Sequence, residues 1–151
     1  MTHTSNEIEI AAPAATIFAL ASQTERWPEI LPHYRYVRVI ARSGATRTVE
    51  MGASRDGIPI SWTAEQTDDA LSPSIRFRHV RGWTRGMDVE WRFAPSDRGT
   101  RVTIEHHLQF LFPIAADWIG EHVVGDFFVH AVAGKTLARI KALAEAEAGA
   151  R

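Results

Sequence analysis

Hydrophobic and polar residues alternate along short stretches that occupy most of the chain between residues 6 and 110. An alternation with a period of two predicts β-strands with one buried face and one solvated face. Turn-forming pairs such as Ser43-Gly44 and Asp56-Gly57 separate several of these stretches. The predicted strands are residues 6–10, 34–41, 47–55, 58–66, 75–81, 87–93 and 101–110. Because the connections after residue 34 are too short to hold crossover helices, we expect an antiparallel meander.

Helical patterns mark three further segments. Pro13 is expected in the first turn of a short helix, where its missing N–H costs nothing. Thr24 is expected to cap a second short helix, which Pro32 ends. From about residue 114 to 147 the apolar residues lie along one broad face, which predicts a helix about 50 Å long. The predicted fold class is therefore α+β: a curved antiparallel β-sheet wrapped around a long C-terminal α-helix, with two short helices after the first strand, in a single domain over residues 1–151.

The alternation also assigns side chains to the two faces of the sheet. One face is apolar and aromatic, and the other carries charges of both signs, suited to cross-strand ion pairs such as Arg78 with Glu90. The apolar face and the long helix are expected to enclose a pocket of at least about 300 Å³ for a small hydrophobic molecule.

Five polar residues interrupt the inward-facing set, and a buried polar group needs a partner. They are Arg55, Gln66, His79, Arg81 and His106. Arg55, Gln66 and Arg81 lie at strand ends, where a side chain leaving the sheet at its rim fits the pattern as well as a role in the pocket. His79 and His106 lie nearer mid-strand, where a hydrogen-bonded core histidine and a catalytic histidine are both compatible with the pattern.

Charge and cysteine content exclude several classes of function. Lys+Arg (17) and Asp+Glu (18) nearly cancel, so no global field attracts nucleic acid or an anionic membrane. The absence of cysteine removes disulfides, thiolate catalysis and Cys-ligated zinc. The first ten residues lack a signal-peptide pattern, and no apolar run reaches the roughly 18 residues of a membrane span. We therefore expect a cytoplasmic protein that is not integral to a membrane.

The histidine spacing and the glycine pattern argue against a metal or a cofactor. His106 and His107 point to opposite faces of one predicted strand. His122 and His130 are two helical turns apart, whereas helical ligand pairs are usually one turn apart. The glycines at the ends of the 82–86 segment link two strands without the Lys and Ser/Thr of a phosphate loop. The sequence therefore predicts no metal site and no cofactor.

With this order of elements, the chain resembles the START-like helix-grip (SRPBCC) superfamily, and within it the polyketide cyclase/dehydrase group, which includes aromatase/cyclases and coenzyme-Q-binding relatives. The resemblance extends from residue 8 to about residue 145. It rests on the Ala12-Pro13 helix start, Trp27-Pro28-Glu29, Tyr34, Trp62, Met87 with Trp91, Gly99-Thr100 and the long final helix. It implies an interior cavity that folds a poly-β-ketone chain for aldol closure and dehydration.

The resemblance also implies roles for individual residues. Trp27, Tyr34, Trp62, Met87 and Trp91 match positions that line the cavity. Arg55 matches an arginine at the end of the cavity. Gln66 stands where such enzymes carry an interior arginine, and a glutamine donates a hydrogen bond but supplies no charge for an enolate.

An enzyme of this kind needs a base and hydrogen-bond donors for an enolate oxygen. We expect His106 or His79 as the base, with Arg55 and Tyr34 as donors. If His106 is the base, its pKa is expected near the working pH and its side chain in the cavity. The expected ligand-binding set is Trp27, Trp62, Gln66, Phe77, Met87, Trp91, Trp118 and Phe128.

Three functions remain open on the sequence. The first is cyclisation and dehydration of a polyketide, favoured by the two inward histidines. The second is a non-catalytic carrier of a lipid or quinone, favoured by the uncharged Gln66. The third is a protein-interaction domain with Trp83 as an exposed anchor. The expected partner is a small hydrophobic ligand (a polyketide, lipid or quinone), and the protein is expected to be a monomer or a homodimer.

Overall fold

The computed structural model describes residues 2–82, 84–108 and 130–149, apart from the side chains of residues 2 and 108. Its strands form one antiparallel sheet. They are β1 (Thr2–Ile10), β2 (Tyr34–Ser43), β3 (Thr46–Arg55), β4 (Ile58–Asp69), β5 (Ser74–Gly82), β6 (Asp88–Ser96) and β7 (Gly99–Leu108). The order across the sheet is β1-β7-β6-β5-β4-β3-β2, so the predicted meander from β2 to β7 is confirmed and β1 pairs with its last strand.

Three short helical segments connect β1 to β2: α1 (Ala14–Ser22), η1 (Thr24–Arg26) and α2 (Trp27–Ile30). Pro13 stands at the N-cap of α1, one position before the predicted first turn. The expectation that Thr24 caps the second helix is wrong, because its buried hydroxyl donates instead to Gln66 Oε1 at 2.7 Å. The hydroxyl of Thr24 therefore binds a residue distant in the sequence instead of the backbone of its own helix.

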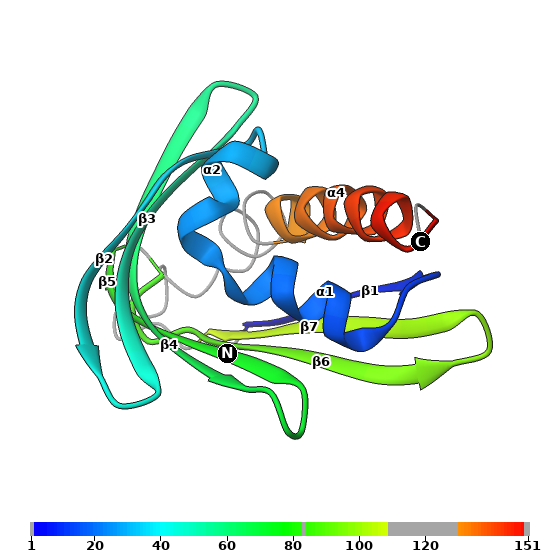
Figure 1. Cartoon of the computed structure of the whole chain (residues 1–151). Coiled ribbons are helices and arrows are strands. Elements are labelled where there is room, and N and C mark those ends of the chain that lie inside the picture. The colour runs from blue at the N-terminus through cyan, green and yellow to red at the C-terminus, as the bar shows by residue number, and fades with distance from the viewer. Residues whose placement is uncertain (1, 83, 109–129, 150–151) are drawn as a thin grey trace.

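The C-terminal helix α4 (His130–Gly149) lies in the concave side of the curved sheet, with α1 beside it (Figure 1). Its buried residues Leu137, Ile140 and Ala144 belong to the same core as Ile17 of α1 and Ile10 of β1. The predicted long helix is confirmed from residue 130 onward, and its earlier part lies outside the described residues. No helix in the described ranges combines the length and the hydropathy that crossing a membrane requires.

The predicted phase of the sheet is confirmed. The inward set Phe77, Val89 and Trp91 is buried, and the outward set Arg76, Arg78 and Arg92 is exposed, with Glu90 half-buried among them. The expected ion pair needs a correction in register. Arg76, rather than Arg78, faces Glu90 across the strands and lies 2.9 Å from its carboxylate.

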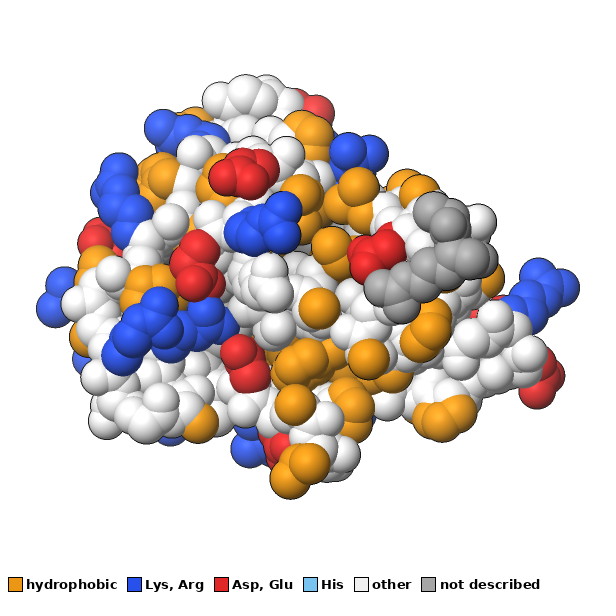
Figure 2. Space-filling model, viewed as in Figure 1, with side chains coloured by type: hydrophobic (Ala, Val, Ile, Leu, Met, Phe, Trp, Pro, Cys, Tyr) orange, Lys and Arg blue, Asp and Glu red, His pale blue; other side chains and the backbone are white. Residues whose placement is uncertain are grey.

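The outward face carries charges of both signs. Figure 2 shows acidic and basic side chains interspersed on the viewed side of the molecule, in keeping with a net charge of −1. Two residues of the predicted inward set leave the core near strand ends: Ile58 is 46% exposed, and Arg81 is also exposed. The core therefore lies between the middle of the sheet, α1, α2 and α4.

Candidate functional site

A cavity of about 70 Å³ lies between the inner face of the sheet, α2 and α4. Its walls come from six strands, two helices and the loop that joins β5 to β6. The described lining residues are Trp27, Tyr34, Met51, Ile60, Trp62, Phe77, His79, Thr84, Met87, Val89, Trp91, Ile104, His106, Val132, Ala133 and Thr136. Apart from a few neutral polar groups, this lining is apolar and aromatic.

The structure brings most of the predicted site residues together at this cavity. Those that line it are Trp27, Tyr34, Trp62, Phe77, His79, Met87, Trp91 and His106. Arg55 and Gln66 are not among the lining residues. Trp118 and Phe128 lie outside the described residues, as does Trp83 of the interaction hypothesis.

The cavity is smaller than the expected 300 Å³ because aromatic rings occupy its interior. The ring of Trp27 lies 4.9 Å from that of Tyr34, 5.9 Å from that of Trp91 and 6.2 Å from that of Phe77. The indole of Trp27 is further held by a 3.3 Å hydrogen bond from Nε1 to the carbonyl of Leu20. The remaining space of about 70 Å³ is large enough for only a few water molecules. A ligand of ordinary size would therefore require some of these rings to move.

The side chain of Gln66 makes hydrogen bonds to neighbouring elements of the fold. Its side chain is fully buried, and Nε2 donates to the carbonyl of Ser22 and to Asp68 Oδ1, both at 2.8 Å. Its Oε1 accepts from Thr24. Arg47 binds the same two acceptor residues, at 2.7 Å and 3.0 Å. Gln66 thus ties β4 to the end of α1, and it is not among the described residues that line the cavity.

Arg55 lies at the end of β3, next to the hairpin turn. Its Nε is 3.5 Å from the carboxylate of Asp56, and its side chain is 28% exposed. Arg55 is not among the described residues that line the cavity, and its expected role as a donor to an enolate stays a prediction. The strand-end position noted in the sequence places it at the rim, where solvent competes for its charge.

His79 is buried and held from two sides. Its ring stacks on that of Trp62 at 5.5 Å, and its Nδ1 lies 2.6 Å from the hydroxyl of Thr84. Gly82 allows the chain to turn back here, because its φ is +101° and a Cβ would meet the carbonyl of Ser61 at 2.8 Å. Burial, reinforced by nearby His106, lowers the pKa of His79 to about 3, so the imidazole is neutral at working pH.

His106 differs from His79 at the Nδ1 atom of the ring. The residue as a whole is partly exposed, but its Nδ1 atom is buried and has no hydrogen-bond partner among the described residues. Burial lowers its pKa to about 3, with smaller contributions from His130, His107 and His3. The expected pKa near working pH does not hold, because the apolar surroundings disfavour the charged imidazolium.

A second polar group lies where α4 meets the start of β2. The hydroxyl of Thr136 donates to the carbonyl of Val132 at 2.8 Å and also lies 2.8 Å from His33 Nε2. Burial lowers the pKa of His33 to about 4, and nearby Lys135 adds to the effect. His33 is therefore neutral at working pH.

The Tyr34 hydroxyl faces the same threonine. Burial raises the pKa of Tyr34 above its ordinary value, although its hydrogen bond with Thr136 opposes this shift. Tyr34 is therefore a neutral phenol at working pH. Sequence reasoning missed Thr84, His33 and Thr136, because no periodic pattern links a loop threonine or a helix threonine to a histidine on another element.

The site offers hydrogen bonds without formal charge. None of the described lining residues is an Asp, Glu, Lys or Arg. The neutral imidazoles and hydroxyls can orient a carbonyl or accept a proton in an apolar setting, where such contacts are stronger than in water. Stabilisation of an enolate would rest on neutral donors alone.

Comparisons with known proteins agree with this fold and cavity. The family model for polyketide cyclase/dehydrase and lipid transport proteins matches residues 10–128. A Streptomyces cyaneus protein, named as a proposed polyketide cyclase, is 34% identical over 103 residues, which cover 66% of this chain and 68% of that protein.

Two solved structures share the fold at lower sequence identity. The Zhui aromatase/cyclase from Streptomyces sp. R1128 has a TM-score of 0.82 at 18% identity, covering 95% of this chain and 93% of its own. A START superfamily protein from Mycobacterium smegmatis has a TM-score of 0.67 at 17% identity, covering 99% and 98%. The structure is therefore a START-like helix-grip fold, and the chain belongs to the polyketide cyclase/dehydrase and lipid transport family.

Proposed function

We propose that the protein binds a polyketide-like molecule in its cavity and promotes aldol cyclisation and dehydration of a poly-β-ketone. The observation that carries the proposal is the cavity lining: apolar and aromatic walls, with neutral polar groups converging from separate elements. This is how small-molecule sites are usually built. The names of the S. cyaneus relative and of the Zhui structure add support for this chemistry.

The proposed base is His106. A base removes a proton from a carbon between two carbonyls, and the resulting carbanion attacks a carbonyl carbon further along the chain. The new alkoxide takes up a proton, and loss of water completes the dehydration. His106 suits this role better than His79, because the Nδ1 of His79 is engaged by Thr84, whereas the Nδ1 of His106 has no partner among the described residues.

The low pKa of His106 limits its strength as a base, so the reaction depends on the acidity of a C–H flanked by two carbonyls. The proposed donor to the enolate oxygen is the hydroxyl of Tyr34, which lines the cavity as a neutral phenol. The tryptophans are proposed to hold the chain in one folded conformation, since fixing the reacting carbons near each other supplies much of the rate.

A non-catalytic carrier of a lipid or quinone is the second candidate. It is favoured by the absence of formal charge from the described cavity wall and by the low basicity of both inward histidines. A carrier needs only apolar walls and a polar anchor. The cytoplasmic location and the monomeric or dimeric state predicted from the sequence stay predictions for either candidate.

The test compares two variants of β7 with a short poly-β-ketone thioester as the substrate. His106→Gln is expected to lower the rate of cyclised product formation by about 10²-fold or more, because general base catalysis contributes about that much. Arg101→Gln is the matched control, since Arg101 lies on the same strand with a half-exposed side chain paired to Glu7 outside the cavity. Product is measured by liquid chromatography with mass spectrometry.

The same experiment separates the two candidates. A cyclase predicts product formation well above the spontaneous rate in the unsubstituted protein, and binding of the thioester that His106→Gln leaves intact. If the unsubstituted protein binds the thioester without accelerating its cyclisation, the carrier is correct and the enzyme proposal fails. If turnover survives in His106→Gln, the base assignment fails and His79 becomes the candidate.

A further inference from the structure

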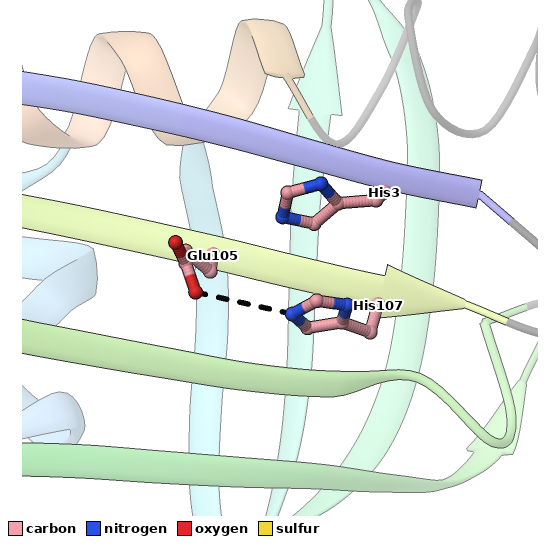
Figure 3. A group of neighbouring side chains, drawn as sticks. All are labelled: His3, Glu105 and His107. Carbon is pink, nitrogen blue, oxygen red and sulfur yellow. Dashed lines mark ion pairs between the residues drawn. The ribbon is translucent and has the colours of Figure 1, made fainter.

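The pairing of β1 with β7 brings two histidines together on the outer face of the sheet. His3 and His107 are direct cross-strand partners, and their rings stack at 4.4 Å with an angle of 16° between their planes (Figure 3). Both residues are exposed. His107 points away from the cavity, on the face opposite to that of His106.

Glu105 completes the group from the same strand as His107. Residues two apart on a strand share a face, so the Glu105 carboxylate lies beside the His107 ring, with 3.9 Å between Oε2 and Nε2. One ligand atom from each of His3, Glu105 and His107 can be chosen so that all three lie within 4.8 Å of one another.

We propose that His3, Glu105 and His107 bind a divalent transition-metal ion of the zinc type. Two imidazoles and one carboxylate are a donor set that holds zinc while leaving a fourth position open to water or another ligand. Bonds of about 2.0–2.1 Å at tetrahedral angles place donor atoms about 3.3 Å apart. The ligand atoms must therefore approach one another by up to about 1.5 Å, and the side chains lie on the solvated face where small rotamer changes are open to them.

The neighbours of Glu105 position the carboxylate for this role. Arg92 Nη2 lies 2.7 Å from Oε1, which leaves Oε2 directed toward His107. Such outer contacts orient metal ligands. The positive charge of Arg92 opposes a cation, but Arg92 also contacts Glu90 at 3.4 Å, and Asp88 lies opposite His107 on the next strand. The surrounding carboxylates thus offset the guanidinium.

A bound ion would add a second link between the edge strand β1 and β7, which are already paired. An ion held by both strands stabilises the folded state by an amount that grows with the logarithm of the zinc concentration above Kd, because it binds the folded chain and not the separated strands. The bound ion would also restrain the part of β7 that carries His106 on its inner side. The proposed zinc site does not depend on the proposed cyclase activity, so experiments can disprove either proposal while the other stands.

The test is a zinc titration of the full chain, without a polyhistidine tag and freed of metal by a chelator. Calorimetry is expected to show saturable binding of one Zn²⁺ per chain, and thermal unfolding should move to higher temperature with zinc. His3→Ala, His107→Ala and Glu105→Gln are each expected to weaken binding at least about tenfold, since losing a ligand should cost no less than losing an outer-shell partner. His130→Ala is the control, because His130 is another exposed histidine outside the cluster.

Several outcomes overturn the proposal. Binding that does not saturate, or that survives both His3→Ala and His107→Ala, excludes the site. A loss in His3→Ala alone would place the ion on His3 and the backbone before it rather than across the two strands. An equal loss in His130→Ala would indicate nonspecific binding to surface imidazoles. Circular dichroism of each variant without metal checks that the fold is retained.

Discussion

His106 and His107 are neighbours on β7 and belong to two different regions of the molecule. The Nδ1 of His106 is buried beside an aromatic cavity, whereas the side chain of His107 is 45% exposed next to His3 and Glu105. On the inner face, burial keeps the imidazole neutral and leaves a polar atom without a partner among the described residues. On the outer face, solvent leaves the imidazole free to rotate toward other ligands. The two faces of one strand therefore favour different chemistry for the same side chain.

The largest expected difference between the two faces of the sheet is in the free energy of unfolding lost when a side chain is removed. Trp91→Ala, on the inner face of β6, is expected to lower the free energy of unfolding by about 3–5 kcal/mol, because it leaves a cavity among buried side chains. Arg92→Ala, one residue later on the outer face, should cost less than about 1 kcal/mol, as expected for a surface ion pair. Urea unfolding measures both. Equal losses would contradict the assigned phase of the sheet.

The pH dependence of the free energy of unfolding tests the burial of His79 on the inner face. The pKa of His79 is about 3 in the folded protein, against an ordinary 6.5 in an unfolded chain. Below pH 6.5 the unfolded state binds the proton more readily, so stability falls as the pH drops toward 3 and is fully present above 6.5. His79→Gln should flatten this dependence by up to about 1.4 kcal/mol per pH unit between pH 6 and 4. Urea unfolding at several pH values measures the slope, and an unchanged slope would show that His79 titrates normally.

Gln66 offers a test of a buried polar group that is fully paired. Gln66→Leu removes three hydrogen bonds and leaves the hydroxyl of Thr24 and the carbonyl of Ser22 with fewer partners. We expect a loss of about 2–3 kcal/mol in the free energy of unfolding, with ligand affinity unchanged. A variant that keeps its stability but loses ligand affinity would return Gln66 to the binding site.

The smallest expected effect has the opposite sign. His106→Leu replaces a side chain whose Nδ1 has no partner among the described residues, so it should leave stability unchanged or raise it by about 1 kcal/mol. If the proposed function is correct, the same variant loses turnover, because a structural cost at this position is retained for chemistry. A loss of stability comparable to that of Gln66→Leu would instead mean that His106 has a structural partner.

The alternation of residues predicted the sheet well because burial and phase are properties of each strand alone. Phe77, Val89 and Trp91 followed from their positions in the sequence, and so did the exposure of Arg76 and Arg92. The partner of Glu90 is Arg76, two residues before the predicted Arg78, because register depends on how two strands pair and not on either strand alone. Thr24 was misassigned for a similar reason, because its partner Gln66 lies 42 residues away.

The candidate site could be predicted only in part. Strand phase brought Trp62, His79 and His106 to one cavity, but phase does not tell whether aromatic rings leave space between them. The outer cluster was missed because the first strand was expected to begin at residue 6, whereas β1 begins at Thr2 and carries His3 opposite His107. The spacing of histidines within one element does not reveal a pair that forms across two strands far apart in sequence.

The central claim is that the inner cavity holds a small hydrophobic molecule, and native mass spectrometry of the purified protein with added ligand tests it most directly. The account predicts that polyketide, quinone or lipid added in stoichiometric amount remains bound at one molecule per chain, and that Trp91→Ala shifts the affinity whereas Arg92→Ala does not. Because the cavity of about 70 Å³ is small, binding should be accompanied by a change in tryptophan fluorescence as the rings move. Absence of any bound ligand across these classes, with unchanged fluorescence, would contradict the account.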